Sequence, residues 1–113
     1  MNGDLTAGEN TADNGGVWES MYGFDIWRTR EADKYIPGLS DEFTQEQLFY
    51  LSFGQIWCAK YKPEYAKWMV DNDPHSPGRF RTDGTVQNAA GFAAAFGCKT
   101  GTPMAPEEPC RVW

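Results

Sequence analysis

The sequence predicts a mainly α-helical fold, and three observations support that class. Two segments begin with the Thr-x-x-Glu/Gln pattern, in which the cap side chain and the third helical side chain each satisfy a backbone N–H group of the other residue. An alanine-rich run near the C-terminus has high helix propensity. Signals for β-strands are nearly absent, and residues 80–86 are the one weak candidate.

The first helix is predicted over residues 7–30. Thr6 is its expected cap, and Glu9 completes the capping box. Two adjacent glycines inside this helix each cost about 1 kcal/mol relative to alanine, so we expect another backbone to approach closely there.

Two further helices are predicted in the middle of the chain. Thr44 and Gln47 form the second capping-box pattern. The residues that follow are apolar on more than one face, which indicates a helix buried on several sides. Pro63 is suited to the first turn of a third, shorter helix.

An irregular loop and a last helix complete the predicted fold. Residues 73–78 hold two prolines and a glycine around His75, which restricts the backbone of that loop. Asn88 is the expected cap of the last helix, and Gly97 is its expected C-terminal stop. Residues 98–109 contain one glycine and three prolines and are predicted to be loop.

Length and charge limit the classes of function. At 113 residues the chain is one domain or less. Ten basic and sixteen acidic residues give a net charge of −6, so we expect no nucleic acid partner. We find neither an apolar run near the ~20 residues that span a bilayer nor a signal peptide. Aromatic residues make up 15% of the chain, which suggests that some rings face a partner absent from it.

The chain has three cysteines, Cys58, Cys98 and Cys110. No two of them have the C-x-x-C spacing of a zinc or redox site. They are either free thiols or half-cystines of an extracellular protein.

Several residues have two interpretations when they are considered alone. Glu9 and Asp13 lie one helical turn apart, which suits a metal ligand with a supporting acid but also suits a solvated helix face. His75 is either a surface residue or a firmly positioned hydrogen-bond donor. Ile56 and Trp57 are core residues, walls of a pocket, or both.

The segment Glu-Asn-Thr-Ala-Asp-Asn-Gly-Gly at residues 9–16 resembles the Glu-Asn-Ile-Ala-Asp-Asn-Gly-Gly segment of the neprilysin family. That family comprises zinc metalloendopeptidases and includes the endothelin-converting enzymes. Thr11 replaces the family's usual isoleucine, for which we expect only a change in packing. The resemblance continues in order through Gln47-Leu48-Phe49, Gln55-Ile56-Trp57-Cys58, Asp73-Pro74-His75-Ser76-Pro77-Gly78, Phe80-Arg81, Gly84-Thr85, Phe96-Gly97-Cys98 and Cys110-Arg111-Val112-Trp113.

The resemblance implies that residues 1–113 are the C-terminal helical part of a thermolysin-like zinc peptidase domain. It implies that Glu9 is a ligand of the one zinc ion and that Asp13 orients a histidine ligand. His75 would donate a hydrogen bond to the oxyanion of the tetrahedral intermediate, and Arg81 would bind the substrate backbone.

The resemblance also assigns a substrate pocket and disulfides. Ile56 and Trp57 would help to line the pocket for the residue after the cleaved bond, which favours bulky hydrophobic side chains. The three cysteines would pair with partners upstream of this segment. Without those partners, Cys98 and Cys110 would be left to pair with each other.

The chain alone cannot form the family's zinc site. It has one histidine and no His-Glu-x-x-His motif, so two zinc ligands and the general base are missing. We therefore expect the chain alone to be inactive. Its partners would be peptide substrates and the N-terminal remainder of the same extracellular domain, which belongs to a secreted protein or a single-pass membrane protein. The alternative is a non-catalytic extracellular binding or antigen module derived from the peptidase fold.

Overall fold

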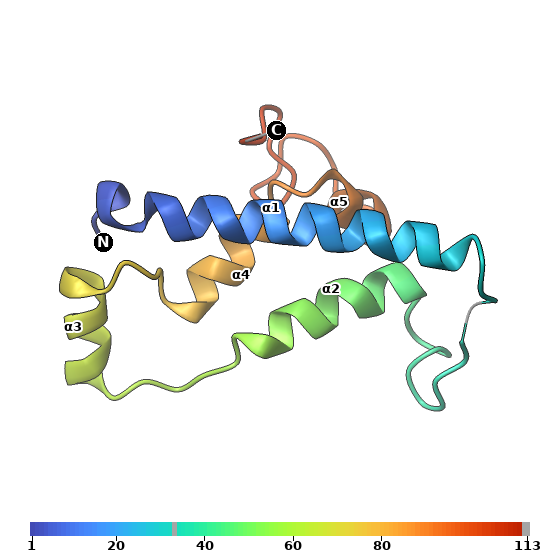
Figure 1. The fold of residues 1–113 in the computed structure, drawn as a ribbon, viewed down its shortest axis with the longest axis horizontal. Coiled ribbons are helices and arrows are strands. Elements are labelled where there is room, and N and C mark those ends of the chain that lie inside the picture. The colour runs from blue at the N-terminus through green and yellow to red at the C-terminus, as the bar shows by residue number, and fades with distance from the viewer. Residues whose placement is uncertain (33, 112–113) are drawn as a thin grey trace.

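The computed structural model describes residues 1–32 and 34–111, and these residues form a helical fold (Figure 1). Val112 and Trp113, which belong to the C-terminal motif of the resemblance, lie outside the described residues. The mainly α class predicted from the sequence is confirmed, because no strand is present in the described part of the chain. The helices are α1 (Gly3–Arg28), α2 (Gln45–Ile56), α3 (Pro63–Asn72), α4 (Gly78–Val86) and α5 (Ala90–Phe96).

Helix α1 begins four residues earlier than predicted. Its cap is Asn2, whose side-chain oxygen accepts a hydrogen bond from the N–H of Asp4. The prediction of Thr6 as the cap is therefore wrong. Thr6 lies inside the first turns, where its hydroxyl donates to the backbone oxygen of Asn2. Asn2 competes successfully because an asparagine oxygen satisfies the free N–H groups at a helix start.

The next two helices begin where the sequence predicts. At the start of α2, both hydrogen bonds of the Thr44–Gln47 capping box are formed. Pro63 occupies the first turn of α3, where its missing N–H costs nothing. The prediction that α2 is buried on several sides is wrong for this structure. Tyr50 is its buried residue, and Ile56 is 70% exposed because no other element of the described chain covers it.

The last two helices correct two predictions. The weak strand candidate at residues 80–86 is wrong, because these residues belong to α4. Helix α5 is capped by Ala89 without a side-chain hydrogen bond, so Asn88 is not its cap. The side chain of Asn88 instead donates to the carbonyl of Gly84 and accepts from the N–H of Cys110. Gly97 ends α5 as predicted, with the left-handed φ of 62° that glycine adopts without strain.

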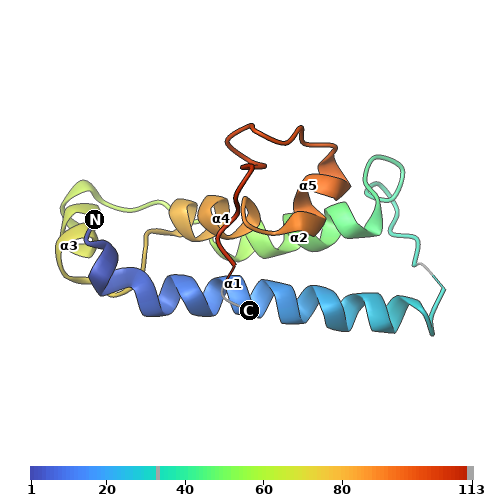
Figure 2. The ribbon, with the colours of Figure 1, turned by 90° about the horizontal axis from the view of Figure 1, so that it is seen from above.

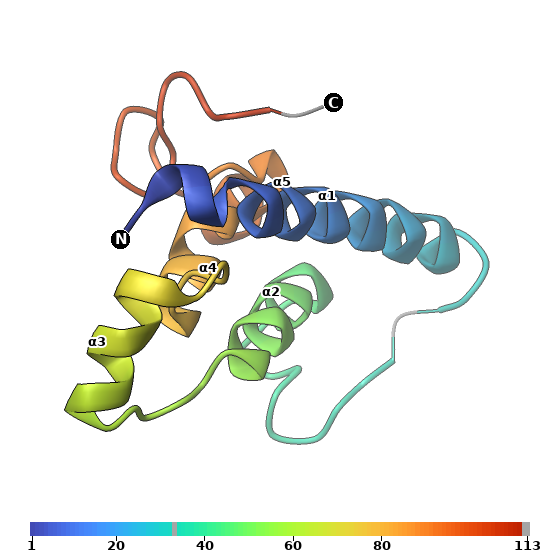
Figure 3. The same ribbon diagram turned by 60° about the vertical axis from the view of Figure 1, so that its left-hand side comes forward.

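The helices pack around a small core. Helix α1 packs against α4, and α2 packs against both α4 and α5 (Figures 1 and 2). Helix α3 lies near the N-terminal end of α1 (Figure 3). Val17, Tyr50 and Val86 form the buried core cluster. No helix among the described residues is long and apolar enough to cross a membrane.

Many large apolar side chains remain exposed in this structure, including Trp18, Tyr22, Tyr65, Trp68 and Phe80. Trp18 stacks on Tyr22, and Tyr65 stacks on Trp68, yet each of these four residues stays at least half exposed. The expectation that part of the aromatic surface faces a partner outside the chain stays a prediction.

Candidate functional site

Helix α1 places two carboxylates on one face. Because α1 is continuous from Gly3 to Arg28, Glu9 and Asp13 stand one turn apart on the same side. Asn10 lies between them, and its carbonyl accepts a 2.8 Å hydrogen bond from the side chain of Asn14.

The loop between α3 and α4 brings His75 to this face. Its Nε2 lies 3.4 Å from Oε2 of Glu9, and both side chains are a little under half exposed. On the other edge of the ring, Nδ1 lies 2.7 Å from Oδ1 of Asp73. The backbone N–H of His75 donates to that same oxygen at 2.8 Å. The imidazole therefore lies between two carboxylates.

Asp73 is adapted to this role by its contacts with His75. The backbone N–H of His75, and then its ring, stabilise the ionised carboxylate and hold the pKa of Asp73 below its ordinary value. An ionised Asp73 keeps the imidazole oriented with Nε2 toward Glu9.

Arg81, on α4, binds the second carboxylate of α1. Its Nε and Nη2 groups donate to the two oxygens of Asp13, each at 2.6 Å. The side chains of Arg81 and Asp13 are only 13% and 10% exposed. The bonds to Asp13 raise the pKa of Arg81, although burial acts in the opposite direction. Nη2 of Arg81 also lies 4.0 Å from Glu9.

The guanidinium of Arg81 lies over the ring of Trp57. The central guanidinium carbon lies 3.9 Å from the centre of the Trp57 ring, which is a close cation–π contact. The indole N–H of Trp57 is buried and has no hydrogen-bond partner among the described residues. Trp57 therefore fixes the plane of Arg81 through its ring face.

Ile56 and Trp57, which the sequence paired as walls of one pocket, have different surroundings here. Ile56 lines an open groove of about 580 Å³ between α1 and α2, together with apolar residues such as Phe24, Phe49 and Phe53. Trp57 is absent from that lining and contacts Arg81 instead. Their joint role in a substrate pocket stays a prediction.

The structure therefore brings together Glu9, Asp13, His75 and Arg81, which we call the polar cluster. Glu9 and Asp13 share one helix, and the other two arrive from more than sixty residues along the chain. The sequence offered no local signal for this approach, which the resemblance alone implied.

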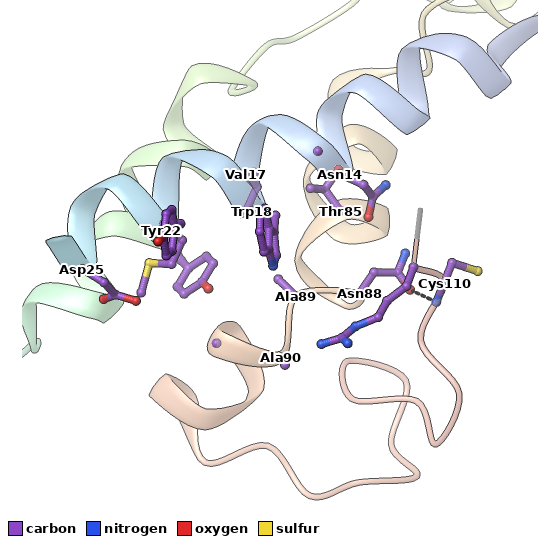
Figure 4. Close-up of a pocket in the computed structure, with 15 residues that line it drawn as sticks. Asn14, Val17, Trp18, Tyr22, Asp25, Thr85, Asn88, Ala89, Ala90 and Cys110 are labelled. Carbon is purple, nitrogen blue, oxygen red and sulfur yellow. Dashed lines mark hydrogen bonds between the residues drawn. The ribbon is translucent and has the colours of Figure 1, made fainter. Parts of the chain in front are cut away.

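A second cavity of about 260 Å³ lies elsewhere on α1, between that helix and the residues around the start of α5. Figure 4 shows Val17, Trp18 and Tyr22 of α1 facing Asn88 and Ala89 across it. No member of the polar cluster lines this cavity, so the two features are separate.

The residues present fit one part of a metal site. Glu9 has a partly exposed carboxylate that makes no fork with Arg81, which suits a single metal ligand. Among residues 1–32 and 34–111, no three His, Cys, Asp or Glu side chains are grouped so that they could hold a metal ion together. The ligand role of Glu9 therefore requires ligands from outside the described residues.

The three cysteines are free thiols in this structure. Cys58 and Cys110 are exposed, and Cys98 is half-buried. Cys98 and Cys110 are not paired with each other here, and pairing with upstream partners stays a prediction.

Sequence reasoning did not single out three residues that shape the site: Asp73, Asn10 and Ser76. Asp73 orients His75, and the Ser76 hydroxyl donates a 2.8 Å hydrogen bond to Oδ1 of Asn10. The available signal was position, because each residue stands within two places of Glu9 or His75 in the chain.

Comparisons with known proteins identify the family of the chain. The family described as Peptidase family M13 matches residues 1–112. The chain is 46% identical to human (Homo sapiens) membrane metallo-endopeptidase-like 1 and 45% identical to human neprilysin. It is 41% identical to endothelin-converting enzyme 1 of Bos taurus. Each match covers 100% of this chain but only 14–15% of the relative's length.

Proposed function

The chain belongs to peptidase family M13, and from that premise we propose that it is the C-terminal part of a zinc-dependent metalloendopeptidase. The complete enzyme hydrolyses peptides on the amino side of hydrophobic residues. The observation that carries the proposal is the convergence of Glu9, Asp13, His75 and Arg81 on one face of α1. Because the chain spans about one seventh of the length of these relatives, we propose the remainder of the same protein as its necessary partner.

Glu9 is the proposed zinc ligand of this segment. Its side chain is 43% exposed, and its carboxylate lies 3.4 Å from His75 and 4.0 Å from Arg81, so it can turn toward a cation at little cost. Two histidines and a general-base glutamate of the remainder would complete the site. When bound, zinc lowers the pKa of a water molecule towards ~7 and polarises the carbonyl to be cleaved.

Asp13 supports the site from behind Glu9. Arg81 uses one lone pair on each Asp13 oxygen, and a carboxylate oxygen can accept a further hydrogen bond. A histidine ligand that donates to Asp13 would have its ring orientation fixed. The fork from Arg81 holds the Asp13 carboxylate in place for that role.

His75 and Arg81 are the proposed donors to the reacting peptide. Nδ1 of His75 lies 2.7 Å from Asp73 and Nε2 faces Glu9, and in the imidazolium form Nε2 carries an N–H group. Nε2–H can then donate to the oxyanion that develops on the cleaved carbonyl. Arg81 keeps the N–H groups of Nη1 for a substrate carbonyl, because Nε and Nη2 are held by Asp13.

The groove between α1 and α2 supports a preference for hydrophobic residues. It is lined largely by aromatic and aliphatic side chains, and Ile56 is one of them. Such a surface favours an apolar substrate side chain by removing it from water. We propose that this groove, with Ile56 in its lining, receives the side chain of the residue that follows the cleaved bond, and that Trp57 joins the same pocket in the complete enzyme.

The complete protein is proposed to act outside the cell, as the ectodomain of a membrane protein or as a secreted enzyme. Cys58, Cys98 and Cys110 then form disulfides with upstream cysteines. Mass spectrometry of the native protein after thiol alkylation is the check. Three alkylated cysteines in the mature protein would contradict this placement.

The peptidase proposal is tested by comparing the chain with the complete protein. The 113-residue chain, given zinc and a fluorogenic peptide with an internal hydrophobic residue, should show no chelator-sensitive cleavage. The complete protein should cleave before the hydrophobic residue, and Glu9→Gln should abolish zinc retention and activity together. Zinc-dependent cleavage by the chain alone, or full zinc retention in the Glu9→Gln protein, would overturn the proposal.

A further inference from the structure

We propose that Asn10 and Ser76 are positioning residues that set the position of His75 relative to Glu9, whether Glu9 contacts His75 or binds a metal ion. The inference rests on the proposed function. Two adjacent residues of α1 face two adjacent residues of the loop before α4. Glu9 lies opposite His75, and Asn10 lies opposite Ser76, whose hydroxyl donates to Asn10 Oδ1 at 2.8 Å.

Of these two contacts, the exposed one between Glu9 and His75 does not hold the loop during the reaction. Glu9 and His75 are each more than 40% exposed, and ion pairs in such surroundings contribute little to stability. In the proposed enzyme the Glu9 carboxylate also binds zinc, so it is lost as the anchor of His75. Another contact must then fix the distance between the ion and the His75 donor.

The buried hydrogen bond between Ser76 and Asn10 has the properties needed to hold the loop in place. Ser76 is only 2% exposed, and its bond to Asn10 links groups that carry no charge and do not bind the ion. A buried hydroxyl that loses its partner costs more than an exposed one, because water does not replace the bond. Metal binding at Glu9 leaves this bond intact.

The amide of Asn10 is held at both ends. Its oxygen accepts from Ser76, and its Nδ2 donates at 3.2 Å to the hydroxyl of Thr6, which is also 2% exposed. The Thr6 hydroxyl in turn donates to the backbone oxygen of Asn2. Rotation of the Asn10 amide would break bonds to two buried hydroxyls at once, so the chain of bonds acts as a unit.

The loop transmits the position of Ser76 to His75. Pro74 and Pro77 restrict the backbone on both sides, and His75 is tied to Asp73 through its N–H and its ring. With so little freedom between them, a shift of Ser76 carries His75 with it.

The test uses Ser76→Ala, Asn10→Ala and the double variant in the complete enzyme. Each single variant should lower kcat by roughly tenfold or more with KM within about twofold, because a donor to the oxyanion acts mainly in the transition state. Zinc content should stay at the wild-type level. The double variant should be no slower than the worse single variant, because both remove the same bond.

Thr85→Val is the matched control. Thr85 is a 3% exposed hydroxyl residue on α4 that lines the second cavity, which no member of the polar cluster lines. This variant should lower thermal stability and leave kcat unchanged. A kcat of the zinc-loaded Ser76→Ala enzyme equal to wild type, or losses that add in the double variant, would overturn the inference.

A second measurement separates this inference from the proposed function. In the 113-residue chain, the NMR cross-relaxation between the His75 ring and the Glu9 side chain should weaken in Ser76→Ala and Asn10→Ala but persist in Thr85→Val. It needs no activity. If the complete protein cleaves no peptide, the proposed function fails and this measurement still decides the positioning role; unchanged cross-relaxation in Ser76→Ala would reject it.

Discussion

Arg81 and Asp13 are joined across 68 residues of sequence by two parallel hydrogen bonds of 2.6 Å, which tie α4 to α1. Both side chains are mostly buried, so neither charge has water as a substitute partner. Asp13→Asn should lower the free energy of unfolding by about 2–4 kcal/mol, because it leaves the guanidinium without its counter-charge. Arg81→Lys should cost about 1–2 kcal/mol, because an ammonium does not form the fork. Urea denaturation followed by circular dichroism measures both.

Arg79→Lys is the control for this prediction. Its bond to Asp83 lies on the surface, with the Arg79 side chain 83% exposed. We expect a change within about 0.5 kcal/mol. Equal losses at the two arginines would mean that the fork does not tie the helices together.

The ring of Trp57 should stabilise Arg81 through its face and not through its N–H. The N–H has no partner among the described residues, whereas the guanidinium lies 3.9 Å from the ring centre. Trp57→Phe should therefore be tolerated better than Trp57→Leu. A double-mutant cycle of Trp57→Leu with Arg81→Lys should give a coupling energy of about 0.5–1 kcal/mol in unfolding. No coupling in that cycle would contradict the stacking role.

Local sequence signals correctly predicted helix ends that are formed by hydrogen bonds between residues close in the chain. The Thr44–Gln47 capping box is complete within four residues, and the structure contains both of its bonds. Residues 80–86 were wrongly predicted as a weak strand, because the helix there is stabilised by contacts with α1 and the burial of Val86, which no local pattern reveals. Thr6 was wrongly chosen as a cap because Asn2 offers an equally good oxygen four residues earlier.

The candidate site also has one feature that the sequence predicts locally and others that depend on tertiary contacts. That Glu9 and Asp13 share a face follows from the helical repeat alone. The approach of His75 and Arg81 is a tertiary contact, and only the family resemblance implied it. The bond from Ser76 to Asn10 was not anticipated at all, because neither residue type indicates metal or acid–base chemistry by itself.

The pairing of Arg28 with Glu46 should make stability depend on pH in the acid range. The pKa of Glu46 is held below its ordinary 4.5 by its backbone N–H at the start of α2, and then by Arg28. A carboxyl with a lowered pKa stabilises the fold fully above its unfolded value, and this contribution is lost as the pH falls through its folded value. Glu46→Gln should therefore lower stability by about 0.5–1 kcal/mol at pH 7.

The difference between wild type and Glu46→Gln should shrink as the pH falls below about 4.5. Unfolding curves in urea at pH 7, 5 and 3 measure this difference. A gap that stays constant down to pH 3 would show that the Glu46 carboxylate is not responsible.

Gly78 marks the point where the His75 loop meets the end of α2, and it offers the sharpest test of how closely the two must approach. A Cβ at this position would lie 2.6 Å from the backbone oxygen of Trp57, which no side-chain rotation relieves. Gly78→Ala should therefore cost about 1–3 kcal/mol by overpacking and should shift the loop that carries His75. Gly84→Ala, on the same helix, meets nothing within 4 Å and should stabilise the fold by about 0.5–1 kcal/mol, because alanine loses less backbone entropy. Thermal unfolding of the two variants should move in opposite directions, and a common direction would show that the contact between Gly78 and Trp57 does not limit the position of the loop.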